Sequence, residues 1–225
     1  MTTWRTTVAC TLTALAAVVT VRARAEAQAF HYPALQLPTV STRDYTTAVA
    51  SGAGTTVLLQ WREGMSARRH WELDAGVADR RGSESLTLFV GGGLAQTLAT
   101  ATGDQPLDVL LAAGAGASFG GGSTLFRVPV GVSVGHTFAL EQGMSLTPFV
   151  HPRASLDVCG SCGTDRGGES EVSLNFDLGA NFQVNRQFAV RASAGFSGSD
   201  VAGGQDTFAV GFTWTPATLA RQAPR

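Results

Sequence analysis

The stretch SEVSLNFDLGANFQVN, residues 170–185, alternates apolar and polar side chains without a break. Adjacent side chains of a β-strand point to opposite faces, so this stretch predicts a strand with one apolar and one polar face. The apolar positions are Val172, Leu174, Phe176, Leu178, Ala180, Phe182 and Val184. The polar positions are Glu171, Ser173, Asn175, Asp177, Gly179, Asn181 and Gln183.

The same alternation recurs along the chain, with breaks at clusters of Gly, Asp, Ser and Asn. The further runs are Thr55–Glu63, His70–Asp79, Ser85–Ala99, Leu107–Phe119, Thr124–Leu140, Ser145–Val158, Gln187–Ser197 and Thr207–Trp214, with a weaker run at Tyr45–Ala50. The pattern predicts an all-β chain of eight to ten strands between residues 45 and 215. Long breaks at Cys159–Glu169 and Ser199–Gln205, against short ones at Glu141–Gly143 and Asn185–Arg186, predict long loops on one side and tight turns on the other.

Composition narrows the class of protein. Of the 225 residues only 15% are charged, 27 are Gly, and the formal net charge is −1. A nucleic-acid-binding protein would carry a basic patch, so no nucleic-acid partner is expected. Few charges and much Gly suit a β-rich chain with one face turned away from water.

The first 29 residues have the features of a secretory signal peptide. Arg5 supplies the positive charge, Val8–Val21 the apolar core, and the alanines from Ala23 to Ala29 three overlapping A-x-A sites, with cleavage expected after Ala27 or Ala29. Residues 30–44 contain two prolines and no period, and are expected to form an extended periplasmic leader. A segment that plugs the barrel is the alternative. Residues 216–225 are expected to be a short polar tail.

The polar face decides between two kinds of barrel. A soluble barrel packs its apolar face inward, whereas a membrane barrel turns it toward lipid and fills a narrow lumen with small and polar side chains. Here the polar face is mostly Gly, Ala, Ser and Thr, with nearly balanced charges that suit an internal ion-pair network. The expected lumen network is Arg62, Glu72, Asp74, Asp108, Arg127, His151, Arg153, Asp157, Asp177 and Arg191.

Aromatic residues lie on the apolar face, many near strand ends. Such positions are typical of the aromatic girdles of membrane barrels. The expected girdle is Trp61, Trp71, Phe126, Phe138, Phe182, Phe188, Phe208 and Trp214.

These features resemble the small bacterial outer-membrane β-barrels of the OmpA/OmpX-like class, over residues 45–214. The resemblance rests on the alternation, on FRVPVGVSVG at residues 126–135, and on the closing strand Thr207–Trp214. It implies a closed antiparallel up-and-down barrel in the outer membrane, with outer-membrane lipid, lipopolysaccharide and the barrel-assembly machinery as partners. The signal read by that machinery usually ends a chain at an aromatic residue, whereas residues 215–225 follow Trp214 here.

For a barrel of this class we expect a structural, adhesive or limited small-solute permeability role. Gly131–Gly135 matches the G-x-S-x-G nucleophile motif, but the alternation runs straight through Ser133, whereas that motif needs a sharp turn into a helix. No catalytic residue is therefore expected. An enzyme acting on outer-leaflet lipid through His136 or His151 is one alternative, and a soluble barrel that binds an apolar ligand is another.

Two cysteines close together in a predicted loop, Cys159 and Cys162, are expected to form a disulfide in a secreted protein. A zinc site would need further ligands, and no second cysteine pair is present. No metal site and no cofactor are expected.

Overall fold

The computed structural model describes residues 34–52, 54–80, 86–120, 123–160, 168–199, 201 and 206–217. The predicted signal peptide, Cys162 and most of the predicted tail lie outside these residues. No helix in the described part of the chain is long and apolar enough to cross a membrane.

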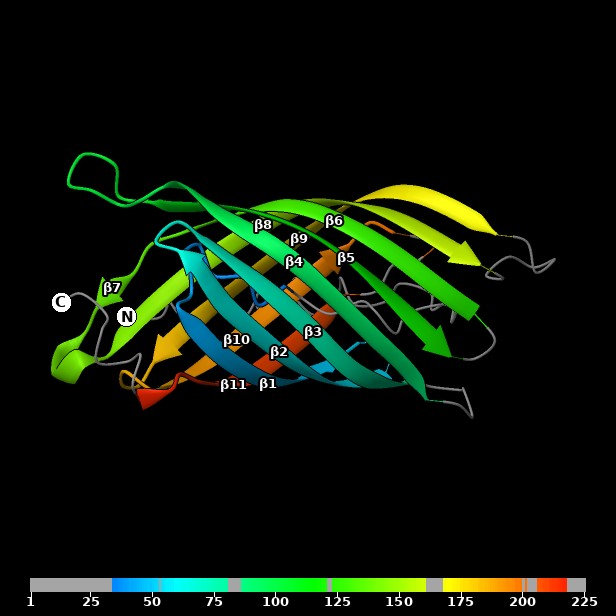
Figure 1. The fold of residues 1–225 in the computed structure, drawn as a ribbon, viewed down its shortest axis with the longest axis horizontal. Coiled ribbons are helices and arrows are strands. Elements are labelled where there is room, and N and C mark those ends of the chain that lie inside the picture. The colour runs from blue at the N-terminus through cyan, green and yellow to red at the C-terminus, as the bar shows by residue number, and fades with distance from the viewer. Residues whose placement is uncertain are drawn as a thin grey trace, which may run out of the picture.

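Ten long strands form the wall of the molecule. They are β1 (Arg43–Ser51), β2 (Gly54–Ser66), β3 (Arg69–Arg80), β4 (Thr87–Ala99), β5 (Asp108–Gly120), β6 (Ser123–Gly135), β8 (Ser145–Gly160), β9 (Glu169–Gln183), β10 (Phe188–Ser197) and β11 (Thr207–Trp214). The two-residue strand β7 (Phe138–Ala139) pairs only with β8, and a 3-10 turn follows it at Glu141–Gly143. Figure 1 shows the long strands tilted around one common axis.

Pairing between the first and last strands closes the sheet. Each long strand is antiparallel to the next, and β1 pairs with β11 from Tyr45 opposite Trp214 to Ser51 opposite Phe208. The prediction of a closed antiparallel barrel is confirmed, with ten strands. The weakest predicted run, Tyr45–Ala50, is the strand that makes closure possible.

The side chains alternate between the two faces of the wall. On β9, Leu174 is 76% exposed while the next residue, Asn175, is 4% exposed. Large apolar side chains point outward along all ten long strands. The alternative of a soluble barrel with an apolar core is therefore wrong, because it requires the opposite orientation of both faces.

The lengths of the loops do not separate the two ends of the barrel. We call end A the end where β1 begins and β11 finishes, on the left of Figure 1, and end B the opposite end. End A has a tight connection between β2 and β3 but a longer one between Ala99 and Asp108. End B has longer connections after β8 and β10 but tight ones after β1 and β5. The predicted contrast between long loops and tight turns holds for the breaks in the C-terminal half on which it rests, and does not extend to the N-terminal half.

Candidate functional site: a plugged polar lumen

An ion-pair network at end A joins the strands on both sides of the closing pair. Arg62 of β2 donates from Nε to Asp44 Oδ1 at 3.0 Å, and Arg191 of β10 donates from Nη2 to Asp44 Oδ2 at 3.1 Å. Arg191 also donates to Thr46 Oγ1 and Asn181 Oδ1, both at 3.0 Å. Arg191 stands opposite Gly211 of β11, which has no side chain to obstruct this reach into β1. The closure is thus secured from inside the barrel.

A second ion-pair cluster lies toward end B. Arg127 of β6 donates to both carboxylate oxygens of Asp157 on β8, at 2.6 and 2.8 Å, and Asp157 also accepts from Ser173 and Ser199. Arg153 forms a similar bidentate ion pair with Asp177, donating to its two carboxylate oxygens at 2.8 and 3.2 Å. These charges are buried, and their partners make burial tolerable.

The ten residues expected in the lumen all lie on its inner face. Eight are nearly fully buried: Arg62, Asp74, Asp108, Arg127, His151, Asp157, Asp177 and Arg191. The Arg153 side chain is also buried, and Glu72 lines the interior cavity. Ion pairs join six of the ten: Arg62, Arg127, Arg153, Asp157, Asp177 and Arg191.

The segment before β1 lies within the lumen. Leu35, Gln36, Leu37 and Pro38 are all buried. The prediction of a periplasmic leader over residues 30–44 is therefore wrong for this part of it. An extended segment has backbone groups to satisfy, and a polar lumen offers partners on every side.

Hydrogen bonds hold this plug, residues 34–42, to four different strands. Ser133 of β6 donates to the Gln36 carbonyl at 2.7 Å, and Ser193 of β10 donates to the Ala34 carbonyl at 3.2 Å. Further contacts run from the Leu35 carbonyl to Arg62 on β2, from the Gln36 amide to His70 on β3, and from the Ser41 N–H to His70. The plug is thus anchored around the circumference of the barrel.

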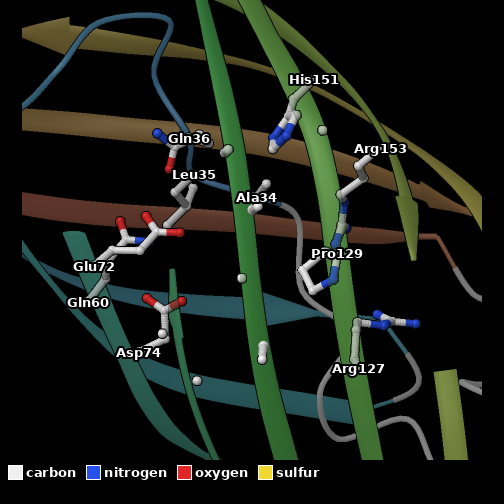
Figure 2. Close-up of a pocket in the computed structure, with 17 residues that line it drawn as sticks. Ala34, Leu35, Gln36, Gln60, Glu72, Asp74, Arg127, Pro129, His151 and Arg153 are labelled. Atoms are coloured by element: carbon white, nitrogen blue, oxygen red, sulfur yellow. The ribbon is translucent and has the colours of Figure 1, made fainter. Parts of the chain in front are cut away.

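A cavity of about 80 Å³ remains beside the plug. Figure 2 shows Gln60, Glu72 and Asp74 on one side of it and Arg127, Arg153 and His151 on the other. Small residues of β4 and β5 leave this space: Gly91, Gly92 and Ala112–Ala115. Gln60 Oε1, Glu72 Oε2 and both ring nitrogens of His151 have no hydrogen-bond partner among the described residues. A space of this size is suited to a few water molecules, which these polar atoms would bind.

A small apolar cluster inside the barrel was missed by the sequence reasoning. Leu35 of the plug packs with Leu58, Phe89 and Leu125, all nearly fully buried. Gly76 makes room for Phe89, because a Cβ there would overlap the phenyl ring. The adjacent pair Leu58–Leu59 was the available signal, since neighbouring residues of a strand cannot both face lipid.

The predicted girdle residues lie on the outer wall, near both ends. At end A, Trp214, Tyr45, Trp61 and Trp71 follow one another on β11, β1, β2 and β3, with ring centroids 5.6, 5.9 and 4.6 Å apart. Tyr45 was not among the predicted girdle residues. Phe138, Phe182 and Phe188 also lie near end A, whereas Phe126 and Phe208 lie near end B.

The proposed catalytic alternatives lack a catalytic geometry. Ser133 is fully buried in an unbroken strand and donates to the plug. His151 faces the lumen, and its ring nitrogens bind no carboxylate or hydroxyl of the described residues. His136 stacks edge-on against Phe138 at end A. The part of the chain that the structure describes holds no cluster of three or more His, Cys, Asp or Glu suited to a metal ion.

Cys159 is buried at the end of β8, and its predicted disulfide partner lies outside the described residues. The disulfide therefore stays a prediction.

An apolar outer wall, aromatic residues near both ends and a polar, ion-paired interior define the class. This is an outer-membrane β-barrel.

No family model and no curated protein matches the chain. Among solved structures, the chain is similar to a KdgM porin at 7% identity, over 77% of this chain and 99% of the porin, with a TM-score of 0.41. It is similar to the N-terminal β-barrel domain of Pseudomonas aeruginosa OprF at 9% identity, over 76% and 96% of the two chains, with a TM-score of 0.34. It is also similar to Ail, the attachment invasion locus protein of Yersinia pestis, at 12% identity, over 76% and 93%, with a TM-score of 0.31.

Proposed function

We propose that this protein is a plugged, non-conducting barrel of the outer membrane, with a structural or interaction role. The observation that carries the proposal is the position of residues 34–38 in the lumen. Residues 35–38 are buried, and the segment is hydrogen-bonded to β2, β3, β6 and β10. A barrel of about eight strands has an interior just wide enough for side chains to fill, and the diameter grows with the number of strands, so ten strands leave room for the plug. With the plug in place, no open path for a solute larger than water is expected.

The ion pairs support a structural role for the interior. Most of the buried charge is used to tie strands to one another, as in Arg127 to Asp157 and Arg153 to Asp177. A transport site would instead present unpaired groups along a continuous path. Contacts with other molecules are then expected at the ends of the barrel and on its outer wall.

Single-channel recording in planar phosphatidylcholine bilayers tests this proposal. The mature protein, refolded and checked by its heat-dependent mobility on a gel, should insert without stable conductance steps. A variant that lacks residues 30–41 but keeps β1 should fold and show discrete steps.

Stable steps from the intact protein would contradict a plugged lumen. A folded deletion variant that stays silent would show that side chains close the lumen without the plug, and would overturn the role given to residues 34–38.

A further inference from the structure

One seam of the barrel wall departs from regular strand pairing. Between β6 and β8, residue pairs form from Thr124–Gly160 to Gly131–Arg153 and again at Val134–Val150, in the same register. No pairs form between Val132–Ser133 and His151–Pro152. Proline has no N–H to donate, so Pro152 removes a hydrogen bond from this part of the wall.

Two more prolines lie nearby: Pro148 weakens the same seam, and Pro129 weakens the neighbouring pairing of β6 with β5. Pro148 of β8 removes a second N–H, at the end A side of the gap. Pro129 of β6 lies where the pairs with β5 are interrupted, opposite Gly114. A closed membrane barrel has no free edge to accommodate prolines, and lost backbone hydrogen bonds are costly at membrane depth. Rules of strand pairing are broken mainly where a function requires it.

A groove and the lumen cavity meet at this seam. The groove, of about 660 Å³, lies on the outer wall over β6, β8, β9 and β10 and is lined by outward-facing Val130, Pro152, Ala154, Leu174, Phe176 and Phe196. Gly131 and Arg153 line both the groove and the inner cavity. The wall that separates the two spaces is therefore thin at Gly131, where no side chain fills it.

The imidazole ring of His151 lies on the inner side of this thin wall. The His151 ring lies against Gly131, since a Cβ added there would overlap its Nε2 atom. His151 is 5% exposed, and neither ring nitrogen has a hydrogen-bond partner among the described residues. Neutral imidazole has one donor and one acceptor nitrogen.

We propose that the seam between β6 and β8 is a lateral binding site for a long-chain fatty acid. The groove faces hydrocarbon and is apolar, so it suits an unbranched acyl tail. A protonated carboxyl group can donate its O–H to one ring nitrogen of His151, which has no partner among the described residues. Because the gap lacks ladder hydrogen bonds, β6 and β8 can part there and let the carboxyl group reach His151 from the membrane.

The test uses the full mature protein in phosphatidylcholine vesicles and a photoreactive diazirine analogue of palmitic acid. After illumination, label should concentrate on peptides that contain residues 130–132 and 152–154. Unlabelled palmitic acid should compete, whereas methyl palmitate, which has no carboxyl donor, should compete poorly. Label spread evenly over the outer wall, or equal competition by the ester, would overturn the proposal.

Two proline variants supply a matched comparison. Pro152→Ala returns one N–H to the gap beside the groove, and one net hydrogen bond should lower labelling there about fivefold. Pro148→Ala returns an N–H to the same seam but lines neither space, so its labelling should equal that of the unmodified protein. Equal labelling of both variants would show that the gap is not the entrance.

His151→Phe keeps a flat ring of similar size and removes both nitrogens. It should abolish the preference for palmitic acid over methyl palmitate while the heat-dependent mobility of the barrel is kept. A preference that persists would remove His151 from the site.

Discussion

Asp44→Asn should destabilise the barrel strongly, because this one carboxylate serves two buried guanidinium groups. The side chains of Arg62, Arg191 and Asp44 are 0%, 3% and 6% exposed, and both arginines bond to Asp44 within 3.1 Å. Asparagine keeps the shape but not the charge. Removing one partner of a buried ion pair costs about 3–5 kcal/mol, so we expect a loss of this size in the free energy of unfolding.

Urea unfolding from lipid vesicles measures this loss, with the fluorescence of Trp61, Trp71 and Trp214 as the signal. Asp108→Asn is the matched control. Asp108 is also buried near end A, but the bond it accepts there comes from the neutral backbone N–H of Ala101, at 2.9 Å. The control should lose about 1 kcal/mol or less, since asparagine still accepts that bond. Equal losses in the two variants would refute the role given to the Asp44 network.

Three further changes test other parts of the structure. Phe176→Arg places a charge on the outer face near the middle of β9, and should cost about 2–4 kcal/mol in vesicle unfolding, whereas Phe176→Leu should change stability little. Gly76→Ala should cost about 1–3 kcal/mol by the same assay, because the added methyl overlaps the Phe89 ring; an unchanged midpoint would contradict that packing. Alkylation of the denatured mature protein should modify neither Cys159 nor Cys162 until a reductant is added, and modification without reductant would exclude the predicted disulfide.

The barrel wall was predictable because strand alternation has a period of two and lipid accepts only one face. The unbroken pattern around Phe176 fixed the face of each neighbouring residue, and the inner positions of Arg62 and Arg191 follow from the same parity. Closure of the barrel was harder to predict from the sequence. The run Tyr45–Ala50 is short and rich in Ala and Thr, so its role emerges only from its pairing with β11.

The sequence left the plug only as an alternative to a periplasmic leader, because an irregular segment has no periodicity that favours one over the other. Residues 34–38 gain their position from partners far away in the sequence, such as Ser133 and Ser193, which look like ordinary small lumen residues. The interrupted pairing between β6 and β8 could not be predicted from the sequence either. Pro129, Pro148 and Pro152 were visible in the sequence, but their meaning depends on which neighbouring strand each missing N–H would face.

The most direct test of the central account is the gel mobility of the protein in the outer-membrane fraction, with and without boiling. The full chain would be expressed with its own signal in a Gram-negative host. A closed membrane barrel predicts recovery in that fraction and a mobility that shifts on heating. A protein that stays in solution without detergent and shows no shift would contradict the membrane barrel and everything built on its outward apolar face.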